Sequence, residues 1–257
     1  MAENSHIQWC DHTHNPWIGC QKVSAGCDNC FAETMMDKRY HRVEWGQRKT
    51  ETTQPSVGTR ILTSEANRRK PVVWNKHHTE FQAKHGHRQR VFCASLSDVF
   101  DNQAPEGARA DLFNLIGGTP NLDWLLLTKR PENIAGMMPG VWLSEMPSNI
   151  WIGTTCEDQA AYDRRWPILQ QIPARVRFIS YEPALSGLTL THHDAKPSWL
   201  IAGGESGQGH RYDNPIWYYR LMDECEKWRV PFFMKQLAGR KPIPDDLLIR
   251  QFPSGIL

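Results

Sequence analysis

The sequence lacks any apolar run near the roughly 18–20 residues that a membrane-spanning helix needs. Its first ten residues, MAENSHIQWC, also lack the basic segment and apolar core that are typical of a secretory signal. We therefore expect a soluble, cytoplasmic protein without a membrane partner.

An excess of one sign of charge is lacking as well. The chain has 30 Lys and Arg against 28 Asp and Glu, a formal net charge of +2, which does not by itself indicate a polyanionic partner. Hydrophobic residues make up 40% and charged residues 23%, as in ordinary globular proteins. A length of 257 residues suits one large α/β unit, so we expect a single domain over residues 1–257.

Short apolar runs recur from residue 90 onwards, with starts separated by roughly 22 to 33 residues. Segments that can form helices lie between them, such as 106–118 and 158–172. This alternation predicts βαβ units and a parallel sheet, and the nearly continuous apolar character predicts strands covered on both faces. The runs lie at 90–100, 123–131, 149–158, 176–184, 198–207 and 230–239.

Each of these runs ends in polar or charged residues. The carboxyl ends of the strands of a parallel β/α barrel meet at one mouth, which carries the site. Six runs and a first strand near Ile7–Cys10 predict a partial parallel (β/α)6-type TIM-like barrel of six or seven strands. A doubly wound open sheet is the alternative topology.

Two segments precede this repeat. Phe31 and Met35, and likewise Ala32, Met36 and Tyr40, lie at helical spacing, which predicts a helix over Asn29–Val43. Residues 45–75 are largely polar and basic, and we expect an insertion or mobile loop there, beside the site.

Three of the seven cysteines lie close together, with the spacing C-x6-C-x2-C at Cys20, Cys27 and Cys30. Thiolates select zinc or iron–sulfur clusters. A structural zinc site needs a fourth ligand, for which His12 and His14 are candidates. A 4Fe–4S cluster held by three cysteines keeps one iron open for a small molecule. The spacing alone allows both alternatives. The remaining cysteines are expected to be ordinary buried residues: Cys10, Cys93, Cys156 and Cys225.

Segments along most of the chain, from Ile7 to Gly239, carry a resemblance to a known family. IQWCDHTHNPWIGCQKVSAGCDNCFAE, FCASLSDVF, LLLTKRPE, IWIGTTCED, RFISYEPA, LIAGGESG and VPFFMKQ resemble, in this order, a phage-associated three-cysteine protein family that is regarded as radical-SAM-like. The usual radical SAM spacing is C-x3-C-x2-C, so this chain lengthens the first gap.

The resemblance implies a cofactor chemistry. Cys20, Cys27 and Cys30 would bind a 4Fe–4S cluster, and the open iron would bind S-adenosylmethionine (SAM). One electron would then cleave SAM reductively, and the resulting 5′-deoxyadenosyl radical would abstract a hydrogen atom from a substrate. Such an enzyme needs an electron donor such as a flavodoxin or ferredoxin.

The polar strand ends supply candidates for contacts to SAM. Its amine and ribose diol need acceptors, whereas its carboxylate needs a cation such as Lys129 or Arg130. Gly203-Gly204-Glu205 matches the letters of the superfamily's GGE motif, although it ends a late strand rather than the second one. The candidates for cofactor binding are Ser95, Ser97, Asp98, Lys129, Arg130, Thr154, Thr155, Glu157, Glu182, Gly203, Gly204 and Glu205.

The substrate is less constrained. The phage association of the family that this chain resembles implies a nucleobase or nucleotide, free or as an intermediate of phage DNA modification. Basic residues near the cysteines, with Trp45 and Trp74 among them, agree with such a substrate, but an amino acid, a peptide or a modified-base precursor is equally allowed. The alternative is a non-catalytic, zinc-stabilised α/β protein that binds nucleic acid. The basic residues are Arg39, Arg42, Arg48, Lys49, Arg60, Arg68, Arg69 and Lys70.

Overall fold

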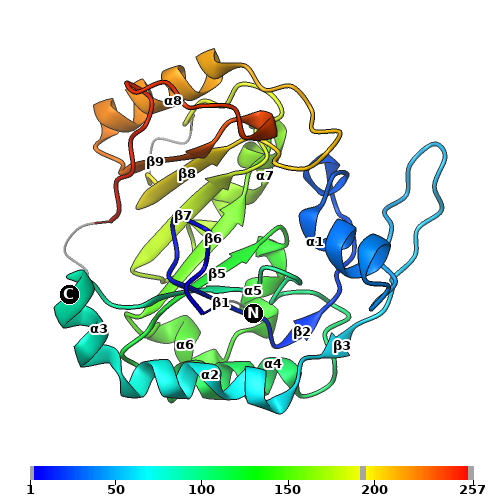
Figure 1. The fold of residues 1–257 in the computed structure, drawn as a ribbon, viewed down its shortest axis with the longest axis vertical. Helices are drawn as coiled ribbons and strands as arrows, with labels where there is room; N and C mark the ends of the chain where they lie inside the picture. Colours follow the sequence, from blue (N-terminus) through cyan, green and yellow to red (C-terminus); the bar gives the residue numbers. More distant parts are fainter. Residues whose placement is uncertain (1–2, 192–194, 254–257) are drawn as a thin grey trace.

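The computed structural model describes residues 3–191 and 195–253. Seven parallel strands form one sheet that curls into a half-barrel (Figure 1), which confirms the predicted partial barrel. The strand order follows the chain without a reversal, so the doubly wound alternative is wrong. In sheet order the strands are β1 (His12–His14), β4 (Arg90–Cys93), β5 (Asp123–Thr128), β6 (Ile150–Thr155), β7 (Val176–Tyr181), β8 (Trp199–Gly203) and β9 (Phe232–Gln236).

Alternate residues of each strand face two different cores. In β5, Trp124 and Leu126 belong to the outer core, which also contains helix residues such as Trp166, whereas Leu125 belongs to the inner core. Both faces are buried, which explains why the strand segments are nearly continuous in apolar residues.

Aromatic side chains fill the inner face of the half-barrel near the amino ends of its strands. Trp199 lies at its centre, with ring centroids 6.0 Å from Trp151 and 6.3 Å from Trp9 in T-shaped pairs. Phe178 and Phe233 pack in the same cluster. This aromatic cluster fills the inner face at the amino ends of the strands. The polar residues lie at the opposite, carboxyl ends.

Most of the helices pack on the outer face of the sheet (Figure 1), where their side chains contribute to the outer core. The predicted helices in 106–118 and 158–172 are confirmed as α4 (Ala108–Gly117) and α7 (Gln159–Leu169). Asp158 caps α7 by accepting a hydrogen bond from the Ala161 amide at 2.7 Å. No helix of the described residues is both long and apolar enough to cross a membrane. The helices are α1 (Phe31–Glu33), α2 (Glu65–Lys76), α3 (His78–His85), α4 (Ala108–Gly117), α5 (Ile134–Met137), α6 (Gly140–Ser144), α7 (Gln159–Leu169) and α8 (Pro215–Trp228).

The predicted first strand was wrong in position. The strand is β1, whereas Ile7–Cys10 forms a turn in which the Cys10 amide donates to the Ile7 carbonyl at 3.1 Å. The apolar character of this turn has another cause, because Trp9 and Cys10 pack into the inner core.

The predicted helix over Asn29–Val43 is shorter and irregular. α1 continues as a π-helix over Thr34–Arg39, which ends at Tyr40. The next residue, His41, has a φ of 48°, a left-handed conformation that interrupts the helix.

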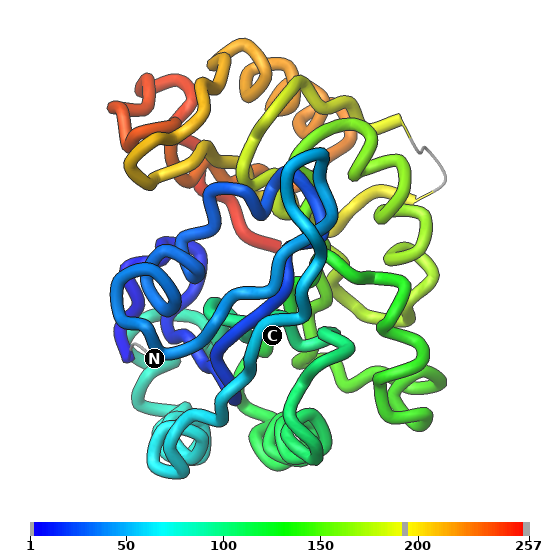
Figure 2. Tube along the Cα trace, turned by 90° about the vertical axis from the view of Figure 1, so that its right-hand side faces the viewer, coloured from blue at the N-terminus to red at the C-terminus, as the bar shows by residue number. Residues whose placement is uncertain are grey.

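The prediction of a loop over 45–75 was wrong for its second half. β3 (Ile61–Leu62) pairs antiparallel with β2 (Trp17–Ile18), and α2 begins after Ser64, whose hydroxyl accepts from the Asn67 amide at 3.4 Å. Residues 47–56 form a hairpin that projects from the body (Figure 1) and faces the viewer in Figure 2. Capping and pairing thus order a segment that is poor in apolar residues.

Candidate functional site

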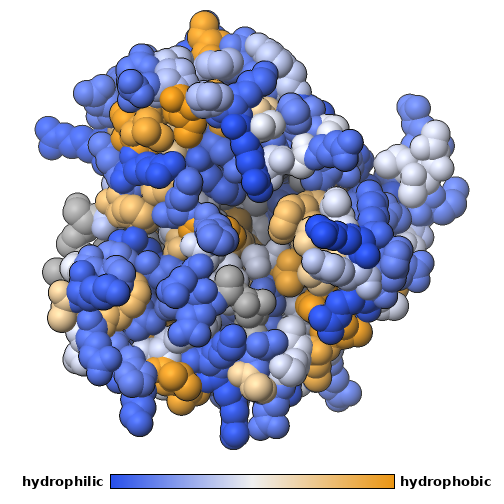
Figure 3. Space-filling view, viewed as in Figure 1, coloured by the Kyte–Doolittle hydropathy of each residue, from blue (hydrophilic) through white to orange (hydrophobic). Residues whose placement is uncertain are grey.

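The three cysteines line one cavity of about 160 Å³ at the carboxyl ends of β4, β5 and β6. In Figure 3 this face of the molecule is hollowed at its middle, between the region of α8 at the top and the region of α1 at the right. Six of the predicted cofactor-binding residues line the same cavity: Ser95, Ser97, Asp98, Lys129, Arg130 and Thr155.

The cysteine loop is built by short elements. Cys20 follows β2, Cys27 ends the 3-10 helix η1 (Ala25–Cys27), and Cys30 is the N-cap of α1. Gly19 begins the loop with a φ of 110°, and a Cβ there would lie 2.2 Å from the Thr59 carbonyl oxygen. The fold therefore requires a glycine at the start of the cysteine loop.

All three are free, half-buried thiols. Burial raises the pKa of Cys20 to about 12, although Arg130 opposes this shift, and burial also raises the pKa of Cys30. In the described part of the chain, no group of three or more His, Cys, Asp or Glu side chains converges on a single-ion site. A 4Fe–4S cluster bonds each thiolate to a different iron, so it does not require the sulfurs to meet at one point.

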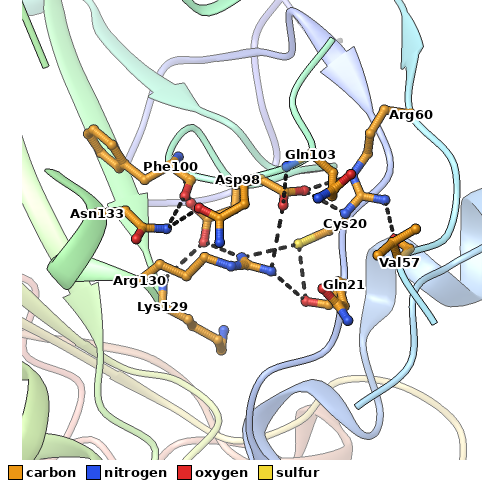
Figure 4. Close-up of polar contacts among 12 residues, drawn as sticks. Cys20, Gln21, Val57, Arg60, Asp98, Phe100, Gln103, Lys129, Arg130 and Asn133 are labelled. Carbon is orange, nitrogen blue, oxygen red and sulfur yellow. Dashed lines mark hydrogen bonds and ion pairs between the residues drawn. The ribbon is translucent and has the colours of Figure 1, made fainter. Parts of the chain in front are cut away.

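Arg130 connects the end of β5 to the cysteine loop (Figure 4). Its guanidinium lies 3.6 Å from Cys20 Sγ and donates to the Gln21 carbonyl at 2.9 Å and to Asp98 Oδ2 at 3.1 Å. Burial is the largest single effect and lowers the pKa of Arg130, but Asp98, Cys20 and Asp101 together outweigh it, so the net pKa lies above its ordinary value. The structure therefore gives Arg130 protein partners on three sides.

Asp98, the ion-pair partner of Arg130, is also fixed by several hydrogen bonds. Its carboxylate accepts from the Thr128 hydroxyl at 2.8 Å and from the Lys129 amide at 3.1 Å, and only 5% of the residue is exposed. In contrast, the ammonium of Lys129 contacts only the Thr155 hydroxyl, at 3.3 Å, among the hydrogen bonds of the described residues. Lys129 is the cation of the cavity that keeps donors for a ligand.

The serines after β4 have protein partners as well. Ser95 accepts from the Asn15 amide group at 3.0 Å, and Ser97 donates to the Trp17 carbonyl at 3.1 Å. Both bonds connect the loop after β4 to the segment between β1 and the cysteines.

Two predicted residues of β6 and its loop lie outside the cavity. Thr154 is fully buried and donates to the Thr128 carbonyl at 2.9 Å. Glu157 forms an ion pair with Arg165 at 2.6 Å, and the charge of Arg165 lowers the pKa of Glu157 against the raising effect of burial. A Cβ on Gly26 would lie 3.0 Å from Glu157 Cδ, so the Glu157 side chain packs directly against the cysteine loop.

Glu205 also supports the cysteine loop. Its carboxylate accepts from Asn29 Nδ2 at 2.8 Å and from the Arg211 backbone amide at 2.7 Å. Arg211 reaches further, to the Ala25 carbonyl at 2.9 Å. These hydrogen bonds lower the pKa of Glu205 although burial alone would raise it. Asn29 and Arg211 are site residues that the sequence analysis missed, because the contacts of Asn29 with Glu205 and of Arg211 with Ala25 join segments that are distant in the chain.

The glycines before Glu205 allow close packing. A Cβ on Gly204 would lie 2.4 Å from the Ala238 amide nitrogen and from Asp213 Oδ2. Gly203 ends β8 opposite Glu182, which forms an ion pair with Lys235 at 2.7 Å. Neither glycine lines the cysteine cavity.

The two candidate histidine ligands lie elsewhere. His12 Nε2 is 2.8 Å from the Gln89 side-chain oxygen, and its ring stacks on Trp74 at 4.3 Å. His14 is buried against Trp124 in a T-shaped contact, and burial lowers its pKa to about 3. Neither lines the cavity, so neither candidate lies where a fourth ligand beside the three cysteines would be.

Several of the predicted basic residues are paired with carboxylates. Arg48 lies 3.1 Å from Asp28, and Arg60 lies 2.7 Å from Asp101 with its side chain 3% exposed. Their charges are therefore partly neutralised by the protein. Trp45 lines the cavity, whereas Trp74 packs away from it.

The fold and site define an α/β half-barrel with a three-cysteine loop across the carboxyl ends of its strands. Residues 4–244 match the family described as "Protein of unknown function (DUF5131)", and the chain belongs to that family. No curated protein and no solved structure matches the chain.

Proposed function

We propose that this protein is a radical SAM enzyme whose Cys20, Cys27 and Cys30 bind a 4Fe–4S cluster. The observation that carries the proposal is that three free thiols line one cavity with the carboxyl ends of parallel strands in a half-barrel. This is the place where β/α barrels carry their sites. The resemblance to the radical-SAM-like, phage-associated three-cysteine family supports the same reading.

The donor set fits the cluster. Three cysteine thiolates leave one iron open, and Arg130 lies 3.6 Å from Cys20, where a positive charge offsets that of the thiolates. When bound, the cluster supplies the electron that cleaves SAM. Lys129 and Thr155 would receive the carboxylate of the methionyl group, because the Lys129 ammonium lines the cavity and makes one side-chain hydrogen bond among the described residues.

The setting follows from the chemistry. All seven cysteines are free, as suits a reducing cytoplasm, and a flavodoxin or ferredoxin would supply the electron. The substrate loses a hydrogen atom to the radical formed from SAM. The family resemblance favours a nucleobase or nucleotide, free or in phage DNA, as that substrate.

The test is metal analysis of protein that is purified and reconstituted anaerobically. We expect about four irons and about four sulfides per chain, and a reduced-cluster electron paramagnetic resonance signal that changes when SAM is added. Cys27→Ala should abolish both, whereas Cys225→Ala, at a buried cysteine of α8, should retain them.

A contrary result would be one tightly bound zinc per chain and no cluster after reconstitution. That result would sink the radical SAM proposal and favour the zinc-stabilised nucleic-acid-binding protein. A complete cluster whose spectrum does not change when SAM is added would also count against the radical SAM proposal.

A further inference from the structure

Four buried charges lead from the residue before β3 to the first cysteine of the loop (Figure 4). The Arg60 guanidinium lies 2.7 Å from Asp101, and Asp101 lies 3.9 Å from the guanidinium of Arg130. Arg130 is 3.1 Å from Asp98, the fourth charge, and donates to Cys20 Sγ at 3.6 Å. The four charged side chains are 1–8% exposed, so solvent screens them little.

A stabilising role does not by itself explain this network. Burying ion pairs costs desolvation, and replacing a buried pair by apolar residues of similar volume is often neutral or stabilising. The four charges also cancel, because two are guanidinium groups and two are carboxylates. What distinguishes the network is its end, where a guanidinium meets a cysteine sulfur.

The donors of Arg130 are directed at this sulfur and at the protein. Its Nη1 atom donates to Cys20, and its Nη2 atom donates to the Gln21 carbonyl at 2.9 Å. The neighbouring Lys129 instead contacts the Thr155 hydroxyl, which lines the cavity. The two consecutive cations at the end of β5 therefore act on different partners, and Arg130 is the one that acts on a cysteine.

Arg130 is also the charged group with the largest effect on Cys20. Burial raises the pKa of the Cys20 thiol to about 12, and Arg130 opposes this shift more strongly than either Asp98 or Asp101 adds to it. The sulfur therefore lies at the positive end of a network that is neutral as a whole.

We propose that Arg130 is a positioning residue that raises the reduction potential of the cluster bound by the cysteine loop, and that Asp98 limits this rise. Reduction by one electron from the donor protein adds a negative charge beside sulfur ligands that are already anionic. A guanidinium that donates to one of those sulfurs favours the reduced form, because hydrogen bonds to the sulfurs and nearby charges set such potentials. The Asp98 carboxylate, 3.1 Å from the same guanidinium, opposes this effect. The inference rests on the proposed function for the presence of the cluster and deepens it by assigning the control of its potential.

The first arm of the test is a redox titration of the anaerobically reconstituted protein, followed by the electron paramagnetic resonance signal of the reduced cluster. Arg130→Met should have a more negative midpoint potential than wild type. At the wild-type midpoint, the ratio of reduced to oxidised cluster should fall about tenfold or more, and tenfold corresponds to about 59 mV for one electron. Arg69→Met removes the same charge from an exposed ion pair of α2 and should leave the midpoint unchanged.

The sign of the shift separates a charge effect from a loosened site. Asp98→Asn removes the opposing carboxylate, so its midpoint should be less negative than that of wild type. The double variant Asp98→Asn/Arg130→Met keeps the net charge and should lie between the two single variants. Arg130→Lys keeps the charge without the forked geometry, so its shift should be smaller than that of Arg130→Met. Arg130→Lys and Asp98→Asn also supply the comparison if Arg130→Met does not assemble a cluster.

The failures of the two proposals are distinguishable. Equal midpoints of wild type and the Arg130 variants, or shifts of the same sign in the Arg130 and Asp98 variants, would overturn the inference and leave the cluster standing. Opposite shifts in a cluster that does not respond to SAM would instead count against the radical SAM proposal and leave the role of Arg130 standing. Reconstituted wild type that holds zinc and no iron would overturn both.

Discussion

Replacing Arg130 by methionine tests the central ion pair of the site. Arg130 is 5% exposed, and its removal leaves Asp98, also 5% exposed, without a charged partner. Removing one partner of a buried pair costs about 3–5 kcal/mol, because the remaining charge stays desolvated. The hydrogen bonds to Asp98 from Thr128 and Lys129 remain, so we expect Arg130→Met to cost about 3 kcal/mol, at the lower end of that range.

The assay is urea unfolding of the metal-free protein, in which a stability change shifts the midpoint at constant slope. Arg69→Met is the matched control, because the side chains of its ion pair with Glu65 are 77% and 69% exposed and such pairs contribute about 0–1 kcal/mol. The double variant Asp98→Asn/Arg130→Met should recover part of the loss, since it leaves no uncompensated charge. Equal midpoints for Arg130→Met and Arg69→Met would refute the reasoning.

Three further changes test other parts of the structure. Glu157→Gln should lower the unfolding free energy at pH 7 by about 3 kcal/mol, because Arg165 loses its buried partner. The folded pKa of Glu157 is lowered, so this stabilisation is present above its ordinary value of 4.5 and is lost as the pH falls below it; the gap between wild type and variant should narrow in acid unfolding curves. The pKa of His14 is lowered from 6.5 to about 3, so between these pH values His14 is protonated in the unfolded chain and neutral in the folded protein. In wild type this contributes about 1.4 kcal/mol of added unfolding free energy per unit of rising pH, and His14→Leu should abolish that contribution. Gly204→Ala should cost about 1–3 kcal/mol in the same urea assay, because its Cβ would lie 2.4 Å from the Ala238 nitrogen, and an unchanged midpoint would show that the turn can relax.

The sheet was predictable because its signal is local. A strand buried on both faces must be apolar throughout, and each of the six predicted runs contains a strand of the sheet. The position of the first strand was not predictable in the same way. The Ile7–Cys10 segment is apolar because Trp9 packs in the inner core. The residues that pair with β4 to form β1 are His12 to His14, which are polar.

The site was predictable in part for the same reason. The cysteine spacing and the polar strand ends are visible in the sequence, and the structure brings six of those strand-end residues to the cysteines. The sequence does not show whether a polar residue at a strand end faces a ligand or another part of the protein. Glu205 illustrates this, because its partner Asn29 lies 176 residues away in the chain.

The six residues between Cys20 and Cys27 have a structural role. They span 21–26, where the barrel contacts the loop. Arg130 donates to the Gln21 carbonyl, Arg211 donates to the Ala25 carbonyl, and Glu157 packs against Gly26. These contacts come from the loops after β5, β8 and β6, so three separate strand ends fix the gap. A loop with a shorter gap would lack some of these attachment points, because its backbone would offer fewer carbonyls between the first two cysteines. The strand-end charges that hold the loop are therefore committed to the protein, whereas the ammonium of Lys129 makes one side-chain hydrogen bond among the described residues, to the Thr155 hydroxyl.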